Sequence, residues 1–156
     1  MSKKLIAALL LSCLTALVPR CVAQTEDVAV VVNSNSRLTN ISLVDLRKIF
    51  AGEKRTWPGG VPIKLIIRAP ECHERFVLLK LLGMKEGEYK QYWSAQTFRG
   101  EAESEPFTAP SLGMTLEAVR IFPGAITLID IRDVKSGIKI LKVDGHMPGE
   151  SGYALH

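Results

Sequence analysis

The sequence predicts an α/β fold in which a mixed, mostly parallel sheet is flanked by helices. Short apolar runs alternate along the chain with amphipathic segments of helical spacing, a pattern typical of strands connected through helices. Glycine and proline residues mark the junctions between these segments. With 156 residues, 47% of them hydrophobic, the chain has enough apolar side chains for one core and therefore one folded domain.

Residues 1–23 are predicted to be a secretory signal peptide that precedes this domain. Met1–Lys4 is a short basic start, Leu5–Val18 is an apolar stretch too short to span a membrane comfortably, and Cys21–Ala23 provides small residues for cleavage. Gln24 is then the first mature residue. The protein is accordingly expected in the periplasm or outside the cell.

A lipobox is an alternative way to process the same segment. Leu10–Cys13 (LLSC) matches one, and cleavage before Cys13 would leave a lipid anchor on the mature protein. Membrane attachment is expected only through the signal peptide or through this anchor.

Removal of the signal peptide changes how the charge is interpreted. The formal charge of +4 falls to about +1, because Lys3, Lys4 and Arg20 leave and no acidic residue does. A nearly neutral mature chain argues against a nucleic-acid partner or an anionic membrane surface. Cys72 is the single cysteine that remains, so no intramolecular disulfide can form.

The first half of the mature chain predicts strand, loop, helix and turn in that order. The β-branched run Asp27–Asn33 is a buried strand, and the polar residues that follow it, up to Asn40, form a loop. Ser42 caps a helix that carries apolar residues at helical spacing and ends at Gly52. Trp57–Gly60 (WPGG) is a turn.

A strand over Val61–Arg68 and two helices follow this turn. The first helix is expected over Glu71–Leu82, with Phe76 among its inward residues and Gly83 as its end. Pro70 is expected at its start. The second covers Glu86–Phe98, and its aromatic stripe is more typical of a core than of a ligand platform. The stripe consists of Tyr89, Tyr92, Trp93 and Phe98.

The last third is expected to begin with an excursion, Gly100–Gly113, which contains two prolines and no regular element. Met114–Phe122 is predicted to be a helix and Ala125–Ile129 a buried strand. Ile138–Val143 alternates like a half-exposed edge strand. The domain is expected to span residues 24–144, and residues 145–156 to form an extended or disordered tail.

Several phrases of this sequence resemble the phosphate-binding-protein-like branch of the type 2 periplasmic substrate-binding fold. Asp45–Trp57 (DLRKIFAGEKRTW) matches its helix, glycine stop and tryptophan turn, Arg68 ends the next strand, and FPGAITLIDI follows near the end. The resemblance implies one lobe of that fold. It also implies a non-enzymatic protein without a cofactor, related to the phosphate-binding component of ABC transporters.

The chain departs from this family in length, since it is long enough for only one of two lobes that would close on a ligand. A cleft between domains is the usual small-ligand site. The second face would have to come from self-association or from another envelope protein. A lobe that has lost its ligand and serves as a protein-interaction module is therefore the alternative function.

The expected ligand is a small oxyanion such as phosphate. In the family, the arginine precedes a Ser-Gly-Thr turn that holds the anion at a helix N-terminus. Here Arg68 is retained, but Cys72-His73-Glu74 replaces the hydroxyl and glycine residues, and Glu74 would repel phosphate. The expected contacts are Ser34, Asn35, Arg68, Cys72 and His73.

Each candidate has a structural alternative. Arg68 could pair with a nearby acid such as Glu71, and Ser34 and Asn35 could form an Asx-type turn. Catalysis by Cys72 and His73 is disfavoured because adjacent helical residues do not face each other and no third residue orients them.

A metal site would have to combine Cys72, His73 and Glu74 with His146. These residues lack the paired ligand spacing of structural zinc sites, so no metal is expected.

Overall fold

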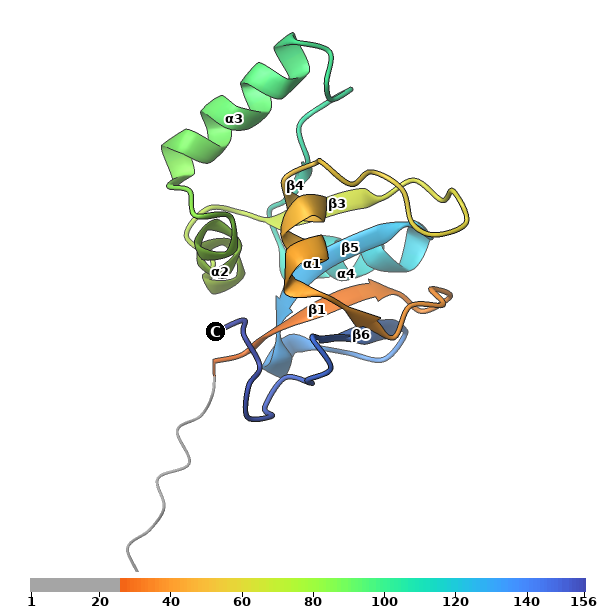
Figure 1. Cartoon of the computed structure of the whole chain (residues 1–156). Helices are drawn as coiled ribbons and strands as arrows, with labels where there is room; N and C mark the ends of the chain where they lie inside the picture. Colours follow the sequence, from red (N-terminus) through yellow and green to blue (C-terminus); the bar gives the residue numbers. More distant parts are fainter. Residues whose placement is uncertain (1–25) are drawn as a thin grey trace, which may run out of the picture.

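A computed structural model describes residues 26–156, so the predicted signal peptide and the lipobox alternative at Cys13 lie outside the described residues. Six strands form one mixed sheet in the order β2-β6-β1-β5-β3-β4 (Figure 1). The pairs β2–β6, β5–β3 and β3–β4 are parallel, and β1 is antiparallel to both of its neighbours, β5 and β6. The predicted mixed, mostly parallel α/β sheet is confirmed.

The strands are β1 (Val28–Asn33), β2 (Asn40–Ile41), β3 (Lys64–Arg68), β4 (Phe107–Ala109), β5 (Ala125–Asp130) and β6 (Ile138–Val143). The helices are α1 (Leu43–Phe50), α2 (His73–Leu82), α3 (Glu86–Phe98) and α4 (Leu112–Ile121), and a single 3₁₀ turn covers Ile131–Asp133. Among residues 26–156, no helix is both long and apolar enough to cross a membrane.

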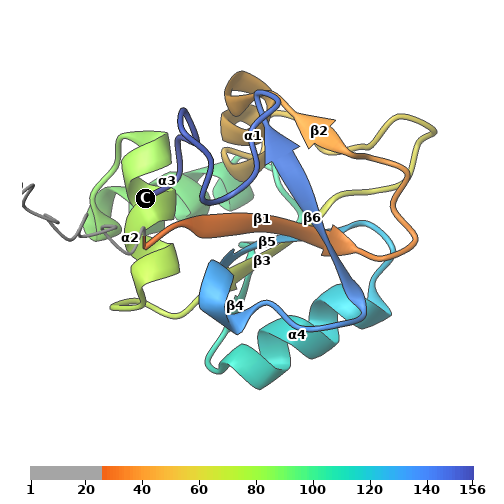
Figure 2. The ribbon, with the colours of Figure 1, turned by 90° about the horizontal axis from the view of Figure 1, so that it is seen from below.

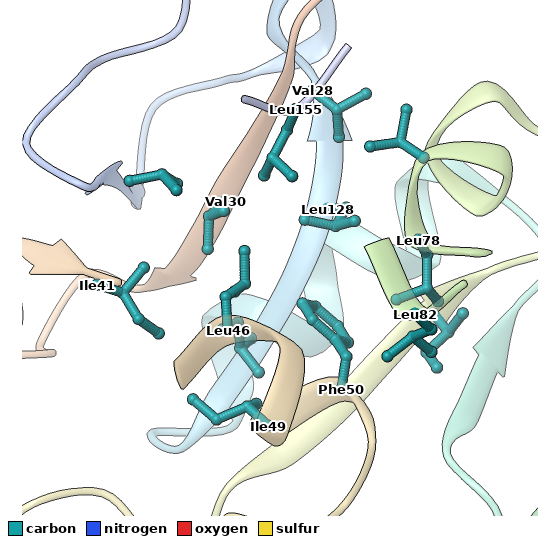
Figure 3. Packing of buried hydrophobic residues seen from close by; sticks show 14 of the residues in the cluster. Val28, Val30, Ile41, Leu46, Ile49, Phe50, Leu78, Leu82, Leu128 and Leu155 are labelled. Carbon is teal, nitrogen blue, oxygen red and sulfur yellow. The ribbon is translucent and has the colours of Figure 1, made fainter. Parts of the chain in front are cut away.

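Helices cover both faces of the sheet. On one face, alternate residues of β1 such as Val28 and Val30 pack with α1, α2 and α3 in the larger core cluster (Figure 3). On the other face, Ala29 and Val31 pack against α4, which lies below the sheet in Figure 2. The strand β1 is buried along its whole length, because side chains on both of its faces meet a helical layer.

The helix α1 forms as its sequence predicts. The hydroxyl of Ser42 accepts a hydrogen bond from the backbone N–H of Asp45 at 3.0 Å, which satisfies one of the free donors of the first turn. Leu46, Ile49 and Phe50 are buried against the sheet (Figure 3). Spacing and cap agree here, so the prediction needed no tertiary information.

The helix α2 begins later than predicted and buries a different face. Its N-cap is Cys72, while Pro70 precedes the cap and Glu71 adopts a left-handed backbone conformation, with φ of 73°. Glu74 and Arg75 are buried, whereas Phe76 is 63% exposed, so the expectation that Phe76 faces inward is wrong. The two charged residues turn toward partners on β3, β5 and α3, which rotates Phe76 outward.

The helix α3 has the predicted bounds, and its aromatic stripe divides into two parts. Tyr89 and Trp93 are buried in the core cluster, and the hydroxyl of Tyr92 donates to the Ala51 carbonyl at 2.7 Å. Phe98, the last residue, is 93% exposed. The prediction that the aromatic stripe packs in the core is therefore confirmed for Tyr89 and Trp93 and is wrong for Phe98.

Residues 100–113 are not a structureless excursion, contrary to the prediction. Phe107–Ala109 forms β4 at the edge of the sheet, next to β3. The following helix begins at Leu112 because Ser111 caps it, with Oγ accepting from the N–H of Met114 at 3.2 Å. The prolines that suggested a loop, Pro106 and Pro110, flank this edge strand without interrupting it.

The strand β6 lies at an edge for only part of its length, so the predicted edge strand is right over Ile138–Ile140 and wrong at Lys142 and Val143. The two-residue strand β2 covers its outer side at Lys142 and Val143, and β1 pairs along its inner side. Ile138–Ile140 are partly exposed, and β2 is too short to pair with them.

The residues after Val143 form no further strand or helix, but they pack onto the domain. Tyr153 and Leu155 belong to the core cluster, and the Tyr153 hydroxyl donates to the Val28 carbonyl at 2.7 Å. The N–H of Val28 donates to the Leu155 carbonyl at 2.9 Å. These contacts place the end of the chain beside the first strand.

Candidate functional site

The side chain of Arg68 projects from the carboxyl end of β3 into a group of polar residues that we call the Arg68 cluster: Arg68, Glu74, Thr115 and Asp130. Its Nε lies 3.6 Å from Oε1 of Glu74, and its Nη1 donates to Oγ1 of Thr115 at 3.4 Å. The Arg68 and Glu74 side chains are only 12% and 7% exposed. The guanidinium is therefore directed into the protein and toward a carboxylate of the same chain.

Glu74 occupies the position that favours an anion. It lies in the first turn of α2, where the helix dipole stabilises negative charge. Its Oε1 also accepts a hydrogen bond from the N–H of Asp130 at 3.4 Å. The cavity that Arg68 and Glu74 line measures about 10 Å³, room for roughly one water molecule and too little for phosphate.

The Arg68 cluster carries more acid than base. Arg132 forms a two-pronged pair with Asp130, at 2.9 and 2.6 Å, which holds the pKa of that carboxyl below its ordinary value. Glu74 lies on α2 and Asp130 at the end of β5, and both are buried. Two guanidinium groups thus already have carboxylate partners, which leaves little attraction for a further anion.

Sequence reasoning identified Arg68 but missed the partners that define its environment. The sequence suggested Glu74 as a source of repulsion and as a possible metal ligand but not as the partner of Arg68, while Thr115 and Asp130 come from α4 and β5, far along the chain. The structural alternative from the sequence was a surface charge paired with an acid such as Glu71. The structure instead buries the Arg68 side chain, and a buried charge requires a partner of opposite sign, which here is Glu74.

Ser34 and Asn35 lie at the opposite end of the sheet from Arg68. They follow β1, which runs antiparallel to β5, whereas β3 runs parallel to β5 (Figure 1). The start of β1, at Val28, pairs with Asp130, which belongs to the Arg68 cluster. One small anion cannot contact both groups, because the length of β1 separates them.

Asn33 shows what the residues after β1 do. Its side-chain amide donates to the carbonyls of Val119 and Arg120, both at 2.9 Å, and so holds the end of α4. Its side-chain oxygen accepts from the N–H of Asn35 at 2.9 Å, the geometry of an Asx turn. An Asx-type turn, the structural alternative to ligand binding for this loop, accounts for these contacts.

Cys72 and His73 lie at the start of α2, close to Arg68 in the chain. Cys72 is a free, half-buried thiol, and its side chain makes no capping hydrogen bond. The Nε2 atom of His73 lies 4.0 Å from a carboxylate oxygen of Glu26, so this ring faces the start of β1. The pair has no arrangement of nucleophile, base and orienting residue.

The residues considered for a metal do not come together. Within residues 26–156, no three side chains of His, Cys, Asp or Glu lie close enough to hold an ion. The ring of His146 instead packs beside Gly152 in the tail, and its backbone bridges to Val143.

A wider groove lies elsewhere, between α3 and the sheet. We call it the α3 groove, and its volume is about 640 Å³, within the range of ligand sites. Apolar residues such as Ile63, Leu65 and Trp93 line it, together with charged residues of both signs, which are Lys54, Arg55, Lys64, Glu103 and Glu105. Figure 1 shows α3 leading away from the sheet and the chain after it returning to β4.

Comparison with solved structures identifies the fold. A phosphate ABC transporter substrate-binding protein from Clostridium perfringens, crystallised with bound phosphate, superposes with a TM-score of 0.62 at 20% identity over 76% of this chain. A phosphate transport receptor from Vibrio cholerae gives 0.63 at 20% identity over 78%. PstS from Borrelia burgdorferi gives 0.57 at 19% identity, also over 78%. The fold of phosphate ABC transporter substrate-binding proteins, predicted from the sequence, is confirmed.

The chain spans about half the length of these proteins, with 45%, 48% and 49% of the three structures covered. It therefore corresponds to a single lobe of that fold. Neither a protein-family model nor a curated protein sequence matches it.

Proposed function

We propose that this chain is a non-enzymatic, exported, substrate-binding-like lobe that acts through contacts with protein and does not hold a free oxyanion. The main support for this proposal is the position of Glu74 at the start of α2, where its carboxylate oxygen Oε1 lies 3.6 Å from Nε of Arg68. The chain thus supplies its own anion to the arginine that the sequence singles out.

A free phosphate would have to displace this carboxylate from Arg68, and three factors oppose that exchange. Glu74 is tethered beside Arg68, so its local concentration far exceeds that of a dissolved ion. The nearby carboxylate of Asp130 adds repulsion, although its own guanidinium partner reduces it. A single lobe also offers no second face to enclose the ion and exclude water.

Three observations support the remaining parts of the proposal. The fold is that of phosphate ABC transporter substrate-binding proteins, and the sequence begins with a predicted secretory signal. Cys72 lacks a base in a catalytic arrangement, which favours a role without chemistry.

Calorimetry of the chain from Gln24 to His156 with phosphate and with sulfate tests the loss of ligand binding. We expect no heat of binding at millimolar ligand. Saturable heat that Arg68→Ala removes and Glu103→Ala keeps would overturn the proposal, since Glu103 is exposed and precedes the start of β4, whereas Arg68 pairs with the last residue of that strand.

Binding of a small oxyanion such as phosphate is the second candidate. It is favoured by Nε of Arg68, which is buried without a hydrogen bond among the described residues, and by the fold shared with a phosphate-bound structure. Oxyanion binding at Arg68 requires Glu74 to move away from the guanidinium. Cys72 and His73 would then lie near the ion, and Ser34 and Asn35 would not contact it. The same titration decides between the two.

A further inference from the structure

We propose that two copies of this chain exchange their tails, residues 147–156, so that Tyr153 and Leu155 of each copy pack beside the start of β1 in the other. This inference rests on the proposed function, that the lobe acts through contacts with protein, and it identifies a second copy as the partner. Three features carry it: an open side of β1, a tail segment that fills this side, and a loop that holds the segment through few contacts. We call the filled position the β1 slot.

The β1 slot exists because β6 does not follow β1 along its whole length. The strand β6 pairs with β1 from Asn33 to Val30, and its end pairs with β2 instead. The N–H of Val28 donates to the Leu155 carbonyl at 2.9 Å, and the Val28 carbonyl accepts from the Tyr153 hydroxyl at 2.7 Å. Val28 is fully buried, so both of its backbone groups need partners, and on this side the tail provides them in place of a strand.

The end of the tail fits this slot with two anchor side chains. Tyr153 and Leu155 are 5% and 2% exposed and belong to the larger core cluster, where Leu155 lies beside Val28 (Figure 3). Lys80 of α2 donates through Nζ to the main-chain oxygen of His156 at 3.2 Å. Alternate side chains in pockets, joined to a strand by a backbone hydrogen bond, are the pattern of peptide recognition by strand addition. The slot therefore selects a tyrosine that is followed two residues later by a leucine.

The loop that carries these anchors, residues 147–152, makes few contacts with the domain. It is closed internally, since the carboxylate of Glu150 accepts from the N–H of Met147 at 2.8 Å. Among residues 26–156, one hydrogen bond ties this loop to the rest of the fold, from the N–H of Gly149 to the carboxylate of Asp27. Gly149 and Glu150 are exposed. Redirecting the loop toward another copy would therefore break that hydrogen bond and leave the internal turn of the loop in place.

A second copy supplies the matching segment without any new surface. In an exchanged pair the same segment fills the same slot, so each hydrogen bond and each buried side chain of the closed tail is kept. A closed tail meets its own slot at an effective concentration in the millimolar range, which a second copy must match. The exchanged pair is therefore expected to form reversibly, with a dissociation constant on the order of 1 mM.

A labelled peptide of residues 147–156 tests whether the slot accepts this segment from outside. Fluorescence anisotropy with the chain from Gln24 to His156 should give saturable binding with a dissociation constant of about 1 mM, since the chain's own tail competes. The Tyr153→Phe chain keeps the ring and loses the hydroxyl, so its own tail competes less well. It should bind the peptide about tenfold more tightly, the effect of one lost hydrogen bond to the buried Val28 carbonyl.

Two altered peptides control for non-specific binding. The Tyr153→Phe peptide should bind the Tyr153→Phe chain about tenfold more weakly than the parent peptide does, because it cannot donate to Val28. The Ser151→Ala peptide should bind like the parent peptide, because Ser151 is exposed. Absence of binding to both chains, or equal binding of all three peptides, would overturn the proposal.

Exchange between copies is tested by mixing isotope-labelled and unlabelled chains, kept reduced because Cys72 is a free thiol. Sedimentation velocity should show a dimer that accounts for about half of the protein at roughly 1 mM, and native mass spectrometry should show mixed pairs. Tyr153→Phe should speed the mixing about tenfold and leave the amount of dimer nearly unchanged, because closed and exchanged tails lose the same hydrogen bond. A strict monomer at this concentration, or a dimer that Tyr153→Phe weakens as strongly, contradicts tail exchange.

The two proposals fail in different ways. Binding of phosphate in the calorimeter by a chain that still accepts the peptide and exchanges its tail removes the proposed loss of ligand but keeps the β1 slot. A chain that binds neither phosphate nor the peptide removes the slot alone, and another protein would then be the partner.

Discussion

The carboxylate of Glu74 faces the guanidinium of Arg68 inside the domain, where both side chains are almost entirely shielded from water. The separation of 3.6 Å is that of an ion pair and exceeds that of a good hydrogen bond. The backbone N–H of Asp130 and the hydroxyl of Thr115 complete the contacts of the pair. Two opposite charges that are both buried depend on each other, since either one alone would be costly to shield from water.

Replacing Glu74 by alanine should therefore strongly destabilise the fold. We expect a loss of about 3 kcal/mol in the free energy of unfolding, because Arg68 is left as an uncompensated buried charge. Urea denaturation measures this loss. The double variant Arg68→Met, Glu74→Leu should lose less than Glu74→Ala alone, and a larger loss would mean that the pair does not hold this part of the core.

Small carboxylates should restore part of the lost stability. Formate can occupy the space that Glu74→Ala leaves and pair with Arg68. With a dissociation constant near 10 mM, formate at 100 mM would add about 1.4 kcal/mol by mass action. Thermal unfolding with formate against chloride at equal ionic strength measures the gain. The gain should vanish in the Arg68→Met, Glu74→Leu variant, whose site carries no charge.

Stability should decline on the acid side through two carboxyls whose folded-state pKa is lowered. Hydrogen bonds from Arg75 hold the pKa of Glu86 below its ordinary 4.5, and Arg132 holds that of Asp130 below 3.8. A lowered folded-state pKa gives stability that is complete above the ordinary value and is lost as the pH falls through the folded one. Unfolding between pH 6 and pH 2 should show this decline.

The Glu86→Gln variant separates the two contributions. It should be less stable than the parent at pH 6 and closer to it at pH 2, where the parent's carboxyl is protonated as well. A constant difference across this range would show that Glu86 gains nothing from its charge.

Gly52→Ala should destabilise the protein more than Gly83→Ala. Both glycines have left-handed backbone angles, φ of 73° and 69°, so alanine is strained at each by about 1 kcal/mol. At Gly52 an added Cβ would lie 2.6 Å from the Trp93 ring, whereas at Gly83 nothing lies within 4 Å. Overpacking should add about 1–3 kcal/mol at Gly52 alone. Equal losses in urea denaturation would exclude this contact.

Local signals predicted the elements in which they agree. In α1 the serine cap, the spacing of Leu46 and Phe50 and the glycine stop all indicate the same helix, and the structure confirms it. In α2 the pattern gave a wrong prediction, because Glu74 and Arg75 are buried against charged partners on other elements and Phe76 is exposed. Hydrophobic periodicity assumes that charged side chains face water, and these two buried charges break that assumption.

The candidate site was only half predictable for a similar reason. Arg68 at a strand end was visible in the sequence, and so was the polar loop at Ser34 and Asn35. Their separation depends on the direction of β1 relative to β5, which no residue pattern records. Strand direction is fixed by the whole topology, and the expected joint contact with one anion depended on it.

The central position of β1 also governs the order in which this chain can fold. Its two neighbours, β5 and β6, and the contacts at Tyr153 and Leu155 all come from the last third of the sequence. A ribosome releases the first strand early, yet that strand has nothing to pair with until synthesis is nearly complete. Such long-range pairing is slow, so the growing chain remains unfolded for longer. That delay is the condition a polypeptide needs if it is to be threaded through a membrane pore before it folds.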